Sequence, residues 1–175
     1  AMVLAGAREG DDVSRVIQER IGGGFTVRLG KYVTVSPAFA FIHQRPVGGI
    51  SEVEKRPWLD GTFTLPVGKW VISNRSRIEH RAVNAGSVRR YRNRLAIEHP
   101  ISIRGFGLRL FAAEEVFYTW KGRTDRTVVR FAGGAARRLG EHVSVDLYYL
   151  RQHDARVSGI NNHLNVLGTS FKIRL

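Results

Sequence analysis

The chain has 175 residues, of which 28 are lysine or arginine and 15 are aspartate or glutamate, so its formal net charge is +13. It has no cysteine, which excludes disulfides, thiolate nucleophiles and cysteine-ligated metal sites. No apolar stretch approaches the roughly 18 residues of a transmembrane helix, and a hydrophobic share of 43% excludes a disordered basic tail. This length predicts one domain.

Hydrophobic residues recur with a period of two, which predicts strands with one apolar and one polar or small face. In one segment, Val143, Val145 and Leu147 alternate with Ser144 and Asp146. A stub at 3–8 is a candidate for one more strand at the start. In chain order, the predicted strands cover residues 15–29, 32–44, 56–67, 70–83, 88–102, 106–120, 125–138, 142–153 and 160–175.

The connections between these strands alternate in length. Tight, glycine-containing turns are expected at residues 30, 68, 104 and 140, and longer polar connections at 45–55, 84–87, 121–125 and 154–159. Most segments are also longer than ordinary globular strands, whose mode is ~5–6 residues, and reach the ~9–11 residues of membrane-spanning strands. These features predict an all-β fold, an up-and-down antiparallel transmembrane β-barrel with meander topology and about 10 strands, within a range of roughly 8–12.

The predicted barrel occupies residues 1–175 as a single domain. An odd number of strands would leave the two termini at opposite ends. The stub at 3–8, or an N-terminal strand of the native protein outside this sequence, would restore an even number, and we leave that choice open.

Charged side chains follow the same period of two. Arginines and one glutamate share a face of 70–83, and the same is true of 88–102, so pairing of these segments as a hairpin would place two arginine rows side by side. Acidic residues are expected to lie between them, because unscreened stacked arginines repel each other. The residues predicted to line a polar interior, or lumen, are Arg75, Arg77, Glu79, Arg81, Arg90, Arg92, Arg94, Glu98, Arg109, Glu115, Arg126 and Arg130.

Two further details concern individual positions. The consecutive acids Glu114 and Glu115 favour a bulge in 106–120. His80 and His99 are candidates to face each other across the hairpin, but none of the six histidines has metal-ligand spacing.

Aromatic residues gather at or near predicted strand ends, as they do at membrane interfaces: Tyr32, Trp58, Trp70, Phe106, Tyr118 and Trp120.

Motifs of other functional classes are missing from the sequence. There is no G-x-S-x-G nucleophile elbow, no phosphate-binding loop and no nucleic-acid-binding signature. We therefore expect no catalytic residues, no cofactor, no metal and no nucleic-acid partner, and we expect the protein not to be an enzyme.

Three short motifs carry a resemblance to a known family. They are the R-x-R-x-E-x-R run at 75–81, the R-x-R-L run at 92–95 and the E-x-F run at 115–117. In this order, and followed by a final alternating strand, they resemble a bacterial family of outer-membrane barrels, domain of unknown function 2490. The resemblance implies a location in the bacterial outer membrane and implies no reaction. The expected partners are the lipid bilayer with its lipopolysaccharide, and the barrel-assembly machinery, although the last strand ends on Leu175 rather than on an aromatic residue.

Several functional interpretations remain open at this point. The arginine-rich lumen fits either a narrow, anion-favouring pore or a structural barrel filled by its own side chains. One alternative is a soluble lipocalin-like barrel that binds an acidic ligand, with the apolar face inside. Another alternative is an outer-membrane lipid-modifying enzyme. The substrate and the oligomeric state stay open.

Overall fold

The computed structural model describes residues 2–10, 15–45, 51–83, 86–103, 105–121, 124–141, 143–156 and 162–173. The regular elements of these ranges are all strands. Among these residues, no helix has the length and apolar character needed to span a membrane. The strands are β1 (Met2–Gly10), β2 (Arg15–Gly24), β3 (Val27–Leu29), β4 (Val33–Gln44), β5 (Glu52–Val67), β6 (Trp70–Val83), β7 (Gly86–Ile103), β8 (Phe106–Lys121), β9 (Thr124–Arg138), β10 (Val143–Arg156) and β11 (Asn162–Ile173).

The strands form one antiparallel meander in the order β1-β2-β4-β5-β6-β7-β8-β9-β10-β11, with β3 paired to β4 beside β2. This confirms the predicted all-β meander of about ten strands. The predicted strand 15–29 is divided into β2 and β3, which both pair with β4. At the break, the Phe25 amide donates a hydrogen bond to the Pro37 carbonyl at 3.2 Å. The early stub belongs to a complete strand, β1, which pairs with β2.

Tight turns follow β3, β5 and β7, as predicted. Gly30, Gly68 and Gly105 have φ values of 83°, 60° and 82°, in the left-handed region that glycine adopts without strain. The expected contrast with long connections at the other end is weaker than predicted. β6 and β7 extend to Val83 and Gly86, and β8 and β9 to Lys121 and Thr124, so the ladders shorten the predicted connections at 84–87 and 121–125.

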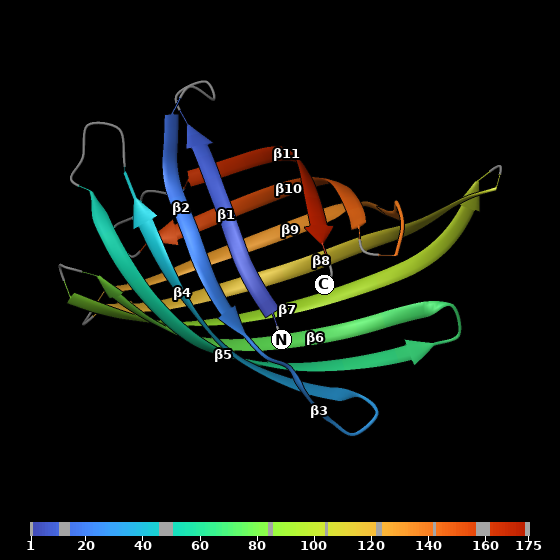
Figure 1. Ribbon diagram of the computed structural model, residues 1–175, viewed down its shortest axis with the longest axis horizontal. Helices are drawn as coiled ribbons and strands as arrows, with labels where there is room; N and C mark the ends of the chain where they lie inside the picture. The colour runs from blue at the N-terminus through green and yellow to red at the C-terminus, as the bar shows by residue number, and fades with distance from the viewer. Residues whose placement is uncertain are drawn as a thin grey trace.

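The sheet curls strongly but does not close into a barrel. In the described residues, β1 pairs with β2 and β11 pairs with β10, and no ladder joins β1 to β11. Figure 1 shows β1 and β2 running steeply across the direction of β10 and β11, an orientation in which two edges cannot form a regular ladder. The closure expected from the sequence is therefore absent from this structure.

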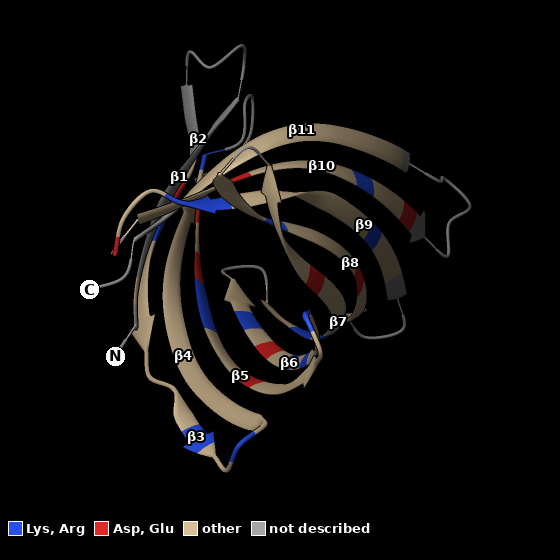
Figure 2. Ribbon diagram, turned by 90° about the vertical axis from the view of Figure 1, so that its right-hand side faces the viewer, with Lys and Arg blue, Asp and Glu red and all other residues tan. Residues whose placement is uncertain are grey.

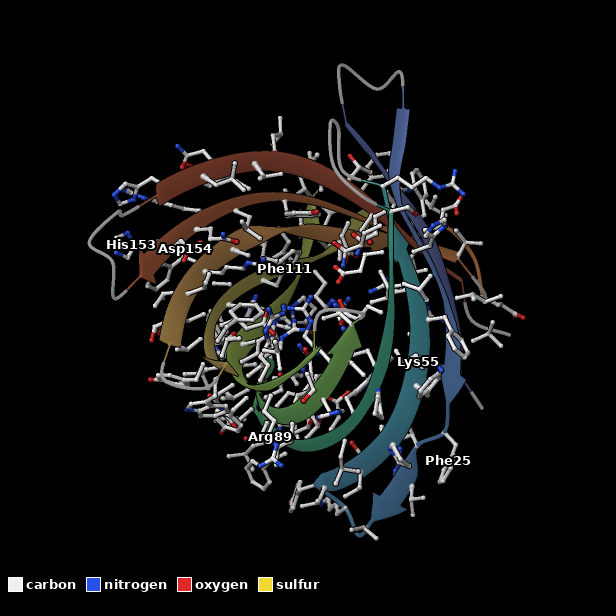
Figure 3. The ribbon with its side chains drawn as sticks, turned by 90° about the vertical axis from the view of Figure 1, so that its left-hand side faces the viewer. Phe25, Lys55, Arg89, Phe111, His153 and Asp154 are labelled. Carbon is white, nitrogen blue, oxygen red and sulfur yellow. The ribbon has the colours of Figure 1, made fainter. Side chains whose placement is uncertain are left out.

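The register divides the side chains between two faces of the curled sheet. One row across the inner, concave face is charged on β5, β6, β7 and β10 and apolar on β8 and β9, and its members are buried or half-buried: Asp60, Arg77, Arg92, Phe117, Val128 and Asp154. The adjacent outer row holds Leu59, Ile78 and Tyr118, which are all exposed. Figure 2 shows the basic and acidic residues that recur along β5 and β6, and Figure 3 shows Phe111 inside the curled sheet and Arg89 outside it.

Candidate functional site

Two arginine rows lie side by side on the inner face. The β6–β7 register places Arg75 opposite Arg94, Arg77 opposite Arg92 and Glu79 opposite Arg90. Like charges directly opposite each other on a sheet are unfavourable. Carboxylates must therefore lie between these arginines, and the structure places them on β5, β6 and β8.

Asp60 of β5 pairs with two arginines of the β6 row, Arg77 and Arg75. Arg77 donates from Nε to Asp60 Oδ1 and from Nη2 to Asp60 Oδ2, both at 2.6 Å. This fork geometry matches the planar guanidinium to the planar carboxylate and fixes both side chains. Arg75 Nε lies 4.0 Å from Asp60 Oδ1, so one carboxylate balances part of two positive charges.

Glu79 and Glu115 both pair with Arg92 in the β7 row. Arg92 donates from Nη1 to Glu79 Oε1 at 2.9 Å and from Nη2 to Glu115 Oε1 at 2.8 Å. Arg75 reaches the same Glu115 oxygen at 2.9 Å. The Glu79 side chain is fully buried, with Arg77 at 3.6 Å and Arg90 at 3.9 Å from its oxygens. A buried carboxylate of this kind requires several cations around it to offset its desolvation.

A second cluster on the same inner face surrounds Glu54, whose exposure is 0%. Arg81 donates two hydrogen bonds of 2.7 Å to its two oxygens, and Arg56 Nε donates another at 2.5 Å. Gln44 of β4 adds an amide donor at 3.2 Å. We call the whole set the inner-face network: Arg56, Arg75, Arg77, Arg81, Arg90 and Arg92 with Glu54, Asp60, Glu79 and Glu115.

Two aromatic rings of the inner face contact the guanidinium groups. The Phe117 ring, 4% exposed, lies under the guanidinium carbons of Arg130 at 4.4 Å, Arg92 at 4.6 Å and Arg90 at 6.0 Å. The Trp58 ring lies 4.9 Å from the guanidinium carbon of Arg77. The negative face of an aromatic ring attracts a cation, so both rings add to the carboxylates in stabilising the arginine rows.

The predicted site residues divide into those inside this network and those outside it. The network contains Arg75, Arg77, Glu79, Arg81, Arg90, Arg92 and Glu115. Arg109 and Glu98 form a separate and more exposed pair at 3.4 Å, and Arg130 donates to Gln152 at 2.6 Å. Arg94 and Arg126 hold inner-face positions in the register, but the Arg126 side chain lies outside the described part of the structure.

Three members were missed from the sequence: Glu54, Arg56 and Asp60. The signal was present, because Glu54, Arg56, Trp58 and Asp60 alternate along one strand face. The predicted strand begins at residue 56, whereas β5 begins at Glu52, so the prediction places Glu54 in a loop.

Two expectations about single positions are wrong. The β7–β8 ladder runs without a register shift through Glu114 and Glu115, so no bulge forms there and Glu114 points to the outer face. His80 and His99 do not face each other. His80 lies opposite Arg89, which is ten residues before His99 on β7. His99 instead packs against the Trp70 ring, with ring centroids 4.3 Å apart. In the described residues, no three side chains of the metal-ligating types lie close enough together to hold an ion.

Comparison with known proteins bears on the identity of the chain. No curated protein matches it, and no solved structure matches it. A family model described as "Protein of unknown function (DUF2490)" matches residues 2–163. This match takes in every strand from β1 to β10 and the whole inner-face network, and it confirms the resemblance carried by the three motifs. The chain belongs to this family of unknown function.

Proposed function

We propose that this chain is an integral β-barrel protein of the bacterial outer membrane, in which the inner-face network lines the lumen and the convex face contacts lipid. The observation that carries the proposal is the sidedness of the sheet. Large apolar side chains are exposed on the outer face, including Ile78 at 65% and Leu147 at 56%, while Glu54 and Glu79 on the inner face are fully buried. A water-soluble fold would expose the charged face and bury the apolar one.

The same sidedness disfavours the lipocalin-like alternative. Such a barrel binds its ligand against apolar inner walls and turns polar side chains toward water. Here Leu59, Phe131 and Leu167 are exposed on the outer face at 49%, 54% and 77%, and the inner face carries the charges. Exposed apolar surface of this extent is typical of a protein that meets lipid.

Exposed aromatic rings at both ends of the strands support the membrane interpretation. Tyr32, Trp70 and Phe106 lie at the tight-turn end, and Tyr118 and Trp120 lie near the opposite end. Amphipathic rings favour the interface between lipid and water. Trp58 does not belong to this girdle, because it is buried in the inner-face network.

If the sheet spans a membrane, its two open edges, β1 and β11, need hydrogen-bond partners. Lipid offers no hydrogen-bond partners, so the edge groups of β1 and β11 must be paired in the membrane-embedded state. This pairing is either with each other or with further sequence between them. The required partners are then the bilayer, with lipopolysaccharide in its outer leaflet, and the machinery that assembles barrels.

Within the lumen, we propose a structural role for the network. Each of its carboxylates is paired with an arginine of a neighbouring strand, and Glu115 of β8 pairs with arginines of both β6 and β7. These pairs fix strand register and fill the interior of a narrow barrel. Its six arginines nevertheless exceed its four carboxylates. This surplus favours anion passage as a second candidate function, since basic rings select anions.

The membrane proposal is tested by extraction and gel migration. We expect the protein to leave cell envelopes only with detergent and to migrate differently before and after heating. A monodisperse monomer in buffer without detergent would contradict the proposal.

Anion passage is tested in planar bilayers. An open pore gives anion-selective current steps that lose selectivity in an Arg90→Ser, Arg92→Ser double variant, whereas Arg89→Ser, on the outer face beside Arg90, leaves them unchanged. Absence of steps in a correctly inserted protein would reject the pore and leave the structural barrel.

A further inference from the structure

A small cavity lies within the inner face, between the arginine rows and β2. Its volume is about 170 Å³. The lining comes from alternate positions of β2, β4, β5, β6 and β7, so every lining residue belongs to the concave side. It is lined by Arg20, Arg56, Arg77, Arg92, Trp58, Ala40 and Ile42.

Positive charge is in excess around this basic cavity. Arg92 is engaged by Glu79 and Glu115, and Arg77 by Asp60. Arg56 donates a hydrogen bond to Glu54 from its Nε atom only. Arg20 has no carboxylate partner among the described residues. Because a guanidinium carries five N–H donors in a rigid fork, Arg20 and Arg56 keep donors for an anion.

A second and independent observation points to a missing acceptor. Trp58 lines the cavity and is 8% exposed, and its indole Nε1 is buried with no hydrogen-bond partner in the described part of the chain. An indole N–H can only donate, and leaving a buried donor unpaired costs about 1–3 kcal/mol. Native structures retain such a group where something else satisfies it.

The volume limits what can enter. A water molecule has a share of about 30 Å³ in the liquid, so the cavity has room for a few waters or one compact ion. Drug-sized molecules and nucleotides need pockets of roughly 300–1,000 Å³. The polar side chains that line it are four arginines and a tryptophan, which donate hydrogen bonds, and Ala40 and Ile42 offer no side-chain acceptor for a cation.

We propose that this basic cavity is a binding site for a small tetrahedral oxyanion of the phosphate class, either the free anion or the terminal phosphate of a monoester. Arg20 and Arg56 donate bidentate hydrogen bonds to its oxygens, and Trp58 Nε1 supplies a neutral donor. The site goes beyond the proposed membrane function and does not depend on it, because its lining lies within β2–β7 wherever the protein is located.

The test is a titration of the folded protein, in detergent or in plain buffer according to which keeps it monodisperse, with inorganic phosphate and with glycerol 3-phosphate. Binding is followed by calorimetry and by the indole N–H signals of the three tryptophans in a ¹⁵N-correlated spectrum. We expect saturable binding that moves one indole signal downfield, and Trp58→Phe identifies that signal by removing it. If both probes bind, the site accepts phosphate monoesters as well as the free anion. If only inorganic phosphate binds, the site accepts the free anion alone.

Variants separate the site from general attraction to a basic protein. Arg20→Gln, at an exposed position, should weaken binding about tenfold or more, because a hydrogen bond to a charged group is lost. Trp58→Phe should weaken it severalfold. Arg109→Gln and Trp70→Phe, which remove the same groups elsewhere, should leave it unchanged. The proposal is overturned if neither probe binds saturably, or if Arg20→Gln and Arg109→Gln weaken binding equally.

Discussion

Arg77 and Asp60 face each other across β5 and β6, and the guanidinium donates one 2.6 Å hydrogen bond to each carboxylate oxygen. Both side chains are largely buried, and the same guanidinium lies 4.9 Å from the Trp58 ring. A pair held in this way cannot shift by one residue without reversing faces. It therefore fixes the register between β5 and β6, and with it which of their side chains face the inside of the sheet.

Asp60→Asn should destabilise the fold strongly. The amide keeps the shape of the side chain but leaves Arg77, and part of the charge of Arg75, uncompensated in a buried position, at a cost of about 3 kcal/mol or more. The free energy of unfolding from urea titration measures this loss. Glu98→Gln is the matched control, because its partner Arg109 is 44% exposed and the pair is 3.4 Å apart. An exposed pair contributes at most about 1 kcal/mol, so equal losses in the two variants would refute the central role of Asp60.

Substitutions on the outer face distinguish lipid from water as its surroundings. Ile78 lies in the middle of β6 and is 65% exposed, and Ile103 lies at the end of β7. In a bilayer, Ile78→Arg should cost about 2–4 kcal/mol and Ile103→Arg about 0–1 kcal/mol, since the penalty depends on depth. In water, both changes should stay within about 0.5 kcal/mol. Unfolding of the two variants in lipid vesicles gives the difference, and two small values would contradict the membrane proposal.

The strands could be predicted because their period-two pattern is a local property. β6, at Trp70–Val83, has the predicted bounds, and its arginines share the predicted face. The break between β2 and β3 was not predictable in the same way, because it depends on which carbonyl of β4 the Phe25 amide meets. Closure of the sheet depends on how curvature accumulates over all the strands, and no single segment encodes it.

Seven of the ten members of the inner-face network could be predicted from the sequence, and three could not. The arginines of β6 and β7 stand out as dense runs, whereas Glu54 and Asp60 are single acids spaced along β5, and Glu54 precedes the predicted start of that strand. Glu114 and Glu115 show the opposite error. Two adjacent acids suggested a bulge, but the ladder is regular and simply places them on opposite faces.

Gly134 is expected to be essential for the curvature of β9 and β10. A Cβ at this position would lie 2.2 Å from the Leu147 carbonyl oxygen and 2.9 Å from Tyr148 Cα, and neither backbone atom can move independently. Gly134→Ala should therefore destabilise the protein by about 1–3 kcal/mol, as overpacking does. Gly61→Ala is the control, because a Cβ there meets nothing within 4 Å. Comparable melting temperatures for the two variants would show that β9 and β10 tolerate a wider separation.

Phe117 is expected to stabilise the arginine rows through its ring rather than through its apolar volume alone. Three guanidinium carbons lie 4.4, 4.6 and 6.0 Å from its centroid, and the ring is 4% exposed. Phe117→Leu keeps a large apolar side chain but removes the negative ring face, which contributes about 2 kcal/mol where the cations are desolvated. The same change at Phe111, on the same strand and face, removes a ring for which no cation contact is found among the described residues. Urea unfolding should show Phe117→Leu to be about 2 kcal/mol more destabilising than Phe111→Leu, and Phe117→Tyr should retain most of the wild-type stability because the phenol keeps the ring face. If both leucine variants lose the same stability, the ring acts only as packing, and the carboxylates alone offset the repulsion between Arg90, Arg92 and Arg130.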